Sequence, residues 1–116
     1  AVGSMVESAV KIRDELKQKG KNVSLVNARF VKPLDEEMLD QLAQTHSVII
    51  TMEENVINGG YGMAVLRYYN TRHTNVKVIN FAVPNSYVEQ GSRDDQLKEC
   101  GLDLESILKR LETELI

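Results

Sequence analysis

The chain has little of what metal and covalent chemistry require. Its single cysteine, Cys100, excludes an internal disulfide and is typical of a reducing compartment. Cys100 precedes Gly101 at the predicted end of a helix, and no obvious base accompanies it, so we expect a structural thiol. The two histidines, His46 and His73, lack metal-ligand spacing with each other or with Cys100. The sequence therefore predicts neither a metal site nor a nucleophile.

Long apolar runs and basic stretches are also absent. No run approaches the roughly 20 apolar residues that cross a bilayer, and charges interrupt residues 5–16, which therefore do not resemble a signal peptide. A net charge of −3 with no basic stretch argues against binding to nucleic acid. The 116 residues, 42% hydrophobic and 27% charged, suit one globular domain over 1–116. We expect no membrane and no nucleic acid as partners.

The chain does contain apolar strands that alternate with capped helices. Strands are predicted near residues 1–3, 22–27, 47–52 and 76–81. Helices are predicted to begin after the caps Ser4, Asp35, Ser92 and Asp103, with a further helix after the glycines at 59–62, and Gly20 is predicted to end the first helix. This alternation predicts an α/β fold, a three-layer α/β/α domain with a mainly parallel open sheet.

The first predicted strand is unusually short. Only Ala1 and Val2 precede Gly3, whereas a strand that enters a helix needs about five residues. We interpret the chain as a fragment that begins inside or just before its first strand, so that an edge strand is truncated.

Three glycines, Gly59, Gly60 and Gly62, join the buried strand at 48–52 to the next helix. Glycine permits positive φ and close backbone approach, and a helix start presents free N–H groups to an anion. The spacing is neither a Gly-Lys-Ser/Thr loop nor a GxGxxG, which favours a structural turn. The alternative is an anion site, in which Ser4 and Glu54 would join the glycines at a crevice of the sheet.

Glu53 and Glu54 stand at the end of the same strand. Adjacent side chains there point apart, so the two carboxylates cannot share a proton as a facing acid/base pair. We expect one of them to accept loop amides or to pair with a cation such as Arg29. Arg29 could instead hold a substrate phosphate, but we favour a structural ion pair of Arg29 with Glu53.

Several runs of residues occur in an order that resembles the C-terminal domain of the 1-deoxy-D-xylulose-5-phosphate synthases, which are transketolase-like thiamine-diphosphate enzymes. The resemblance covers essentially the whole chain. Its most specific part is Asn27-Ala28-Arg29-Phe30-Val31-Lys32-Pro33-Leu34-Asp35. The other runs are Gly3-Ser4-Met5-Val6, Glu53-Glu54-Asn55, Gly59-Gly60-Tyr61-Gly62, Gly91-Ser92 and Gly101-Leu102-Asp103.

The resemblance implies an enzyme that condenses pyruvate with glyceraldehyde 3-phosphate, releases carbon dioxide and supplies isoprenoid, thiamine and pyridoxal synthesis. That enzyme is a homodimer in the cytoplasm, or in the plastid stroma of a plant, and it uses thiamine diphosphate and Mg²⁺. A Gly-Asp-Gly…Asn motif of the first domain holds the cofactor, and a glutamate of the second domain activates it. This chain contains no Gly-Asp-Gly, so the resemblance implies the third domain alone, with a role in assembly, no catalytic residue and no bound cofactor.

Departures from the family pattern are local. The family usually has Ser at Met63, Gly at Ala82, Asp at Asn85 and His at Gln90. Two other functions remain open at this point. One is a regulatory domain that binds an anion or a metabolite. The other is the C-terminal domain of a 2-oxo-acid dehydrogenase β subunit, which shares the fold but fits residues 29–35 less well.

Overall fold

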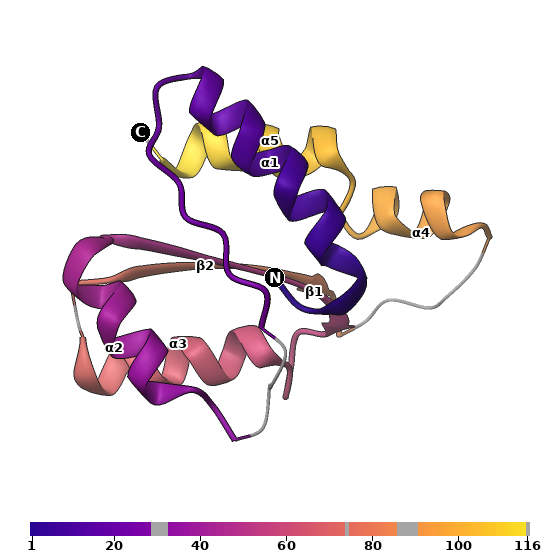
Figure 1. The fold of residues 1–116 in the computed structure, drawn as a ribbon. Helices are drawn as coiled ribbons and strands as arrows, with labels where there is room; N and C mark the ends of the chain where they lie inside the picture. Colours follow the sequence, from indigo (N-terminus) through magenta and orange to yellow (C-terminus); the bar gives the residue numbers. More distant parts are fainter. Residues whose placement is uncertain (29–32, 74, 86–90, 116) are drawn as a thin grey trace.

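The computed structural model describes residues 1–28, 33–73, 75–85 and 91–115. A 3-10 turn over Gly3–Met5 leads into helix α1. The elements in chain order are α1 (Val6–Gln18), α2 (Glu36–Thr45), β1 (Val48–Val56), α3 (Tyr61–Arg72), β2 (Lys77–Val83), α4 (Arg93–Glu99) and α5 (Leu104–Glu114). The strands form a middle layer, with α1 and α5 on one face and α2 and α3 on the other (Figure 1). The predicted α/β fold class is confirmed.

Strands β1 and β2 pair in parallel, with Val48 opposite Lys77 and Met52 opposite Phe81. The register shifts between Met52 and Val56, where β1 ends. Parallel neighbours need a long crossover, which α3 supplies here. The continuous apolar run of β1 is explained by burial on both faces, because side chains alternate between the two helical layers.

Two of the four predicted strands are not regular strands. Residues 1–2 and 22–28 form no regular strand, and the described part of the chain has a two-stranded sheet. Hydrogen bonds nevertheless follow a parallel pattern: the Val2 amide donates to the Met52 carbonyl over 2.9 Å, and the Ala28 amide donates to the Ala1 carbonyl over 2.9 Å. Residues 1–2 turn directly into a 3-10 helix, so they make isolated hydrogen bonds and no ladder. The expectation of four regular strands is therefore wrong, whereas the parallel direction is correct.

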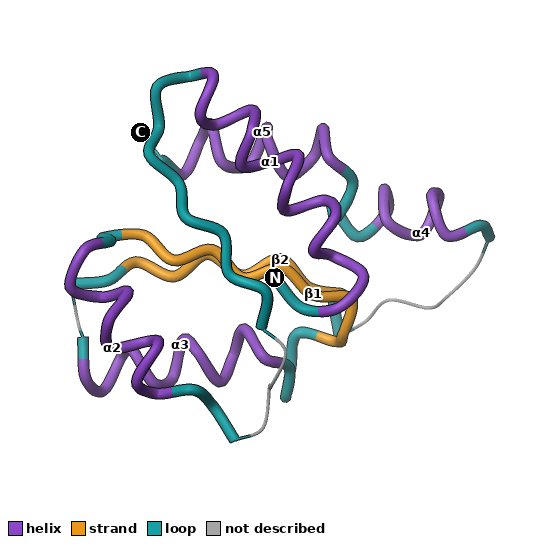
Figure 2. Tube along the Cα trace, viewed as in Figure 1, coloured by secondary structure: helices purple, strands orange, loops and turns teal. Residues whose placement is uncertain are grey.

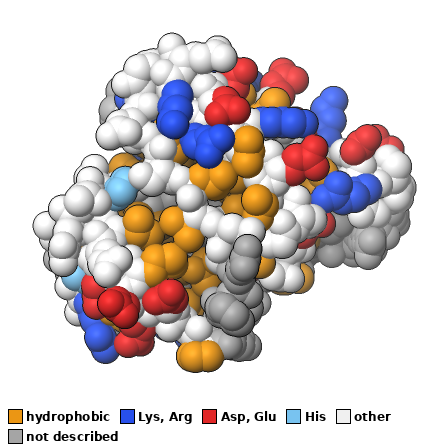
Figure 3. All heavy atoms as spheres, in the orientation of Figure 1, with side chains coloured by type: hydrophobic (Ala, Val, Ile, Leu, Met, Phe, Trp, Pro, Cys, Tyr) orange, Lys and Arg blue, Asp and Glu red, His pale blue; other side chains and the backbone are white. Residues whose placement is uncertain are grey.

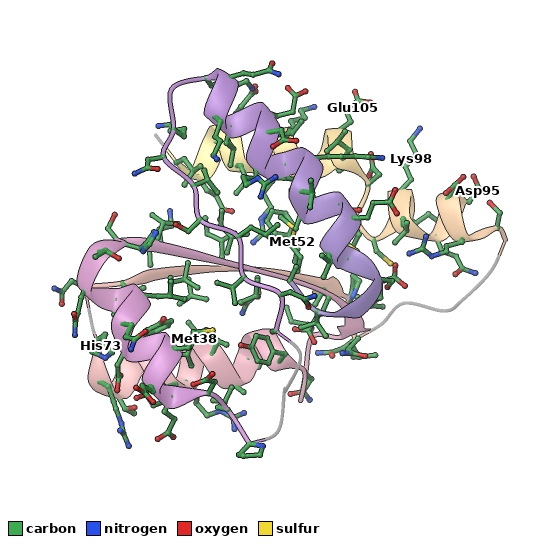
Figure 4. The ribbon with its side chains drawn as sticks, viewed as in Figure 1. Met38, Met52, His73, Asp95, Lys98 and Glu105 are labelled. Atoms are coloured by element: carbon green, nitrogen blue, oxygen red, sulfur yellow. The ribbon has the colours of Figure 1, made fainter. Side chains whose placement is uncertain are left out.

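The apolar core has two parts, one on each face of the sheet. On the α1 face, the buried residues are Met5, Ala9, Ile12, Leu16, Met52, Ile79, Phe81, Leu102, Ile107 and Leu111. On the α2 face they are Leu39, Val65, Tyr68 and Tyr69. Figure 4 shows Met52 on the first face and Met38 on the second. The sheet is thus covered on both sides, as the sequence predicts.

Most of the predicted helix ends are confirmed. The side chains of Asp35, Ser92 and Asp103 each accept an amide hydrogen bond at the start of α2, α4 and α5. The prediction for Ser4 is wrong, since Ser4 lies inside the 3-10 turn and makes no capping hydrogen bond. An N-cap residue needs an extended backbone, and Val2 has that conformation instead.

Candidate functional site

The glycine loop lies at the carboxyl end of β1 and is held to the end of β2. The Ile57 amide donates to the Val83 carbonyl over 2.8 Å, and the Asn58 amide donates to Asn85 Oδ1 over 3.1 Å. These two bonds fix the chain between β1 and the first residue of α3. The side-chain oxygen of Asn85 makes the second of these contacts. The loop is therefore anchored to the end of β2 and the residues that follow it, which lie far from the loop in the sequence.

The carboxylate of Glu53 occupies the amino-terminal end of α3. Its Oε1 accepts the Tyr61 amide over 2.9 Å and its Oε2 accepts the Gly62 amide over 2.6 Å. The Asn55 side-chain amide also donates to Oε1, over 3.3 Å. Glu53 is 1% exposed, so these bonds are made away from water. A buried negative charge at this end complements both the free amides and the helix dipole.

Helix α3 needs this distant carboxylate because its own N-cap residue is Gly60, which has no side chain to accept an amide. Glu53 is eight residues before Tyr61 in the chain and reaches the helix through the tertiary fold. A local sequence signature such as a capping box does not detect a partner at this separation. The anion that the free amides of this helix start can bind is thus the Glu53 carboxylate of the same chain.

The three glycines are constrained in different ways. Gly59 has a φ of 81°, which side chains rarely adopt. A Cβ on Gly60 would lie 2.6 Å from Glu53 Oε1 and 2.7 Å from the Val56 carbonyl oxygen. A Cβ on Gly62 would lie 2.6 Å from Thr51 Oγ1, which itself donates to Asn80 Oδ1 over 2.6 Å. Glycine at these positions lets α3 approach the sheet and the Glu53 carboxylate closely.

The other residues of the predicted site lie apart from this cluster. Glu54 forms an ion pair with Arg93 at the start of α4, so the two adjacent glutamates have separate partners. Ser4 is exposed in the 3-10 turn, and no hydrogen bond among the described residues joins it to the loop. Arg29 lies outside the described residues, so its ion pair with Glu53 stays a prediction. Gln90 lies outside them as well.

A second polar cluster connects α2 with the end of α3. Asp40 accepts the Tyr68 hydroxyl over 2.6 Å and contacts His73 Nε2 over 2.7 Å. The hydrogen bond from Tyr68, followed by that from His73, lowers the pKa of the Asp40 carboxyl. The neighbouring Tyr69 hydroxyl donates to the Leu39 carbonyl over 2.8 Å. Sequence reasoning missed this cluster, because its members are about 30 residues apart and no spacing rule joins them.

The Asp40 cluster combines residue types that also serve in acid/base catalysis, but its setting is structural. The side chain of Asp40 is 44% exposed and that of His73 is 30% exposed, on the outer surface of two packed helices. Asp40 on α2 bonds to Tyr68 on α3 and to His73 directly after it, so the contacts join the two helices. We assign the cluster to helix–helix attachment.

Neither a metal centre nor a membrane segment is present in residues 1–28, 33–73, 75–85 and 91–115. No group of three or more metal-binding side chains gathers there, and no helix among them is long and apolar enough to span a bilayer. Burial raises the pKa of the Cys100 thiol, which favours the unreactive protonated form.

The glycine loop does not fit the diphosphate of thiamine diphosphate. Such a group would need the amides at the start of α3, and those of Tyr61 and Gly62 are already bonded to Glu53. A second anion beside a buried carboxylate would also be repelled.

Comparison with known proteins gives the class of this fold and site. Residues 1–107 match the model of the family described as "Transketolase, C-terminal domain", so the chain belongs to the transketolase C-terminal domain family. Curated relatives are 1-deoxy-D-xylulose-5-phosphate synthases, which confirms the resemblance derived from the sequence motifs. The protein from Clostridium tetani is 42% identical over 111 residues, and that from Lachnoclostridium phytofermentans is 46% identical over 112 residues.

The matched regions cover almost all of this chain but only a small part of each relative. They cover 96% of this chain but 18% of each of these two relatives. Among solved structures, one described as "Split gene transketolase, inactive beta4 tetramer" aligns with a TM-score of 0.86 over 97% of this chain and 36% of the other chain. At 23% identity, this likeness establishes the fold alone.

Proposed function

We propose that residues 1–116 form the C-terminal domain of a 1-deoxy-D-xylulose-5-phosphate synthase and that this domain supports assembly and carries no catalytic residue. The whole enzyme would condense pyruvate with glyceraldehyde 3-phosphate in a bacterial cytoplasm and work as a homodimer. Its thiamine diphosphate and Mg²⁺ would be held by other domains. The identity to synthases over 96% of the chain supports the assignment.

The contacts of Glu53 support the non-catalytic role. The site with the most suggestive sequence, a glycine loop at a helix start, has its amides bonded to a carboxylate of the same domain. The alternative of a regulatory anion site gains no support from this geometry, because a ligand would have to displace a buried charge. We infer that the loop holds β1 and α3 in position.

The experiment uses a full-length synthase that contains this domain and compares the parent with Glu53→Gln. We expect a lower dimer fraction in sedimentation at low protein concentration, with KM for both substrates and for thiamine diphosphate unchanged in the remaining dimer. Glu54→Gln is the matched control, since its partner Arg93 lies on the surface. An intact dimer with a KM for glyceraldehyde 3-phosphate raised about tenfold or more would contradict the assembly role.

A further inference from the structure

Strand β2 forms an outer edge of the sheet in the described part of the chain, because β1 is its only neighbouring strand there. The Lys77 amide donates to the Ser47 carbonyl over 2.9 Å, and the Val83 carbonyl accepts from the Ile57 amide over 2.8 Å. Lys77 and Val83 therefore direct their backbone groups towards β1. Since this direction alternates along a parallel strand, the residues that alternate with them direct their amides and carbonyls away from β1. These residues are Val78, Asn80 and Ala82.

The side chain of Arg110, on α5, covers the middle of this outer edge. Its Nη1 donates to the Asn80 carbonyl over 2.9 Å, and its Nε donates to Glu114 Oε2 over 2.9 Å. The guanidinium carbon lies 4.6 Å from the centre of the Phe81 ring. A planar guanidinium suits this combination of an aromatic face with directed hydrogen bonds. Arg110 thus occupies the outward carbonyl at the centre of β2.

A second cation stands at the start of the same edge. Lys77 is exposed, and its Nζ donates to the Glu114 carbonyl over 2.9 Å. Figure 2 shows α5 on one face of the two paired strands, and Arg110 extends from it to the outer edge of β2. Figure 3 shows the opposite side of the molecule, where residues 22–28 lie and hydrophobic side chains are visible between the helical layers. Lysine and arginine at a sheet edge discourage pairing with another strand, so the β2 edge has the composition of a protected edge.

The outer edge of β2 is complementary to itself. In an antiparallel pair of two such strands related by a two-fold axis, Asn80 would lie opposite Asn80 of the second copy, and Val78 opposite Ala82. Asn80 is the middle residue of Lys77–Val83 and faces outward, so this register pairs the whole length of the strand. The two Asn80 residues would exchange both of their backbone hydrogen bonds at the axis. The carbonyl that Arg110 occupies is therefore the acceptor at the centre of this pairing.

We propose that Arg110 prevents the outer edge of β2 from pairing with β2 of a second copy. Its hydrogen bond occupies the central acceptor, and the two-fold axis would bring two guanidinium groups together, where like charges repel each other. The inference goes beyond the assembly role proposed above, because it concerns an association that the domain avoids. In a homodimer each domain would carry this edge, so the pairing would join one dimer to the next in open chains.

The test measures the mass of a purified full-length synthase that contains this domain, by sedimentation over a range of protein concentrations. Arg110→Met removes the guanidinium but keeps an unbranched side chain that can cover Phe81. Lys109→Met is the matched control, because it removes the same charge from the adjacent exposed position. A double variant combines Arg110→Met with Ala82→Pro, which removes an outward amide and is tolerated on an edge strand. Hydrogen exchange of residues 77–83 is followed by mass spectrometry.

We expect Arg110→Met to raise the average mass about twofold or more over the parent as concentration increases, and to slow exchange in residues 77–83 about tenfold. Lys109→Met and the double variant should keep the mass of the parent. An unchanged mass for Arg110→Met would overturn the proposal. So would association that Lys109→Met shares, that Ala82→Pro does not remove, or that leaves residues 77–83 unprotected, as unfolding would. The mass is compared with that of the parent whatever its own assembly, so failure leaves the assembly role untouched.

Discussion

Replacing Glu53 with glutamine tests the hydrogen bonds between this side chain and the start of α3, because glutamine has nearly the same shape as glutamate. The side-chain amide can still accept one of the two backbone N–H groups at the start of α3. Its NH₂ group, however, faces the other N–H, so one donor in a buried position loses its acceptor. The substitution also removes the negative charge at the amino-terminal end of the helix.

The magnitude follows from these two losses. A hydrogen bond to a charged group contributes about 1.5–3 kcal/mol, and a charge near a helix end adds about 0.3–1 kcal/mol. Glutamine relieves some of the cost of burying a carboxylate, which offsets part of the loss. We expect Glu53→Gln to lower the free energy of unfolding by about 2 kcal/mol, out of the roughly 5–15 kcal/mol typical of a domain. The melting temperature would fall by about 6–10 °C.

The assay is urea unfolding followed by circular dichroism, with Glu54→Gln as the matched control. Glu54 pairs with Arg93 at the surface, where such pairs contribute about 0–1 kcal/mol. We therefore expect the control to unfold close to the parent. If Glu53→Gln unfolds at the same urea concentration as Glu54→Gln, the buried carboxylate does not hold the start of α3.

Three further predictions concern stability. Gly60→Val places a side chain against Glu53 and Val56, and should lower the melting temperature through strain of about 1–3 kcal/mol; an unchanged melt would contradict the close contact. The lowered pKa of Asp40 adds stability above about pH 4 that is lost as pH falls through that pKa, so Asp40→Asn should flatten the acid decline in urea unfolding. Burial raises the pKa of Tyr69 to about 12, so its contribution is complete below about pH 10 and is lost as pH rises towards 12. Tyr69→Phe should remove a tyrosine that ionises near pH 12 in an absorbance titration, and an unaltered titration would exclude this assignment.

Features set by neighbouring residues could be predicted from the sequence. Asp35, Ser92 and Asp103 cap their helices through contacts three residues away, so composition and spacing identify them. The alternation of apolar runs with helices is also a pattern of neighbouring residues, and it correctly predicted helices on both faces of a parallel sheet. The prediction that Ser4 caps the first helix is wrong because a 3-10 turn begins at Gly3. Whether the helical segment starts at Gly3 or after Ser4 depends on the hydrogen bond between Val2 and β1.

Features set by tertiary contacts could not be derived in full. The sequence indicates that one of Glu53 and Glu54 accepts loop amides, but which one depends on the side of the sheet that α3 covers. The Asp40 cluster depends on the packing of α2 against α3, which no local pattern records. Regular strands near residues 1–3 and 22–27 were expected from apolar runs that alternate with helices. A ladder, however, requires a continuous partner strand, and a local apolar run does not supply one.

The central claim is that the amides at the start of α3 belong to Glu53 and are not a ligand site. The most direct measurement is an NMR titration of the ¹⁵N-labelled chain with inorganic pyrophosphate, observed at the amides of Tyr61 and Gly62. Because both amides are bonded to Glu53, we expect both signals to stay in place up to millimolar pyrophosphate. A saturable shift of these two amides below that concentration, absent for amides of α5, would contradict it.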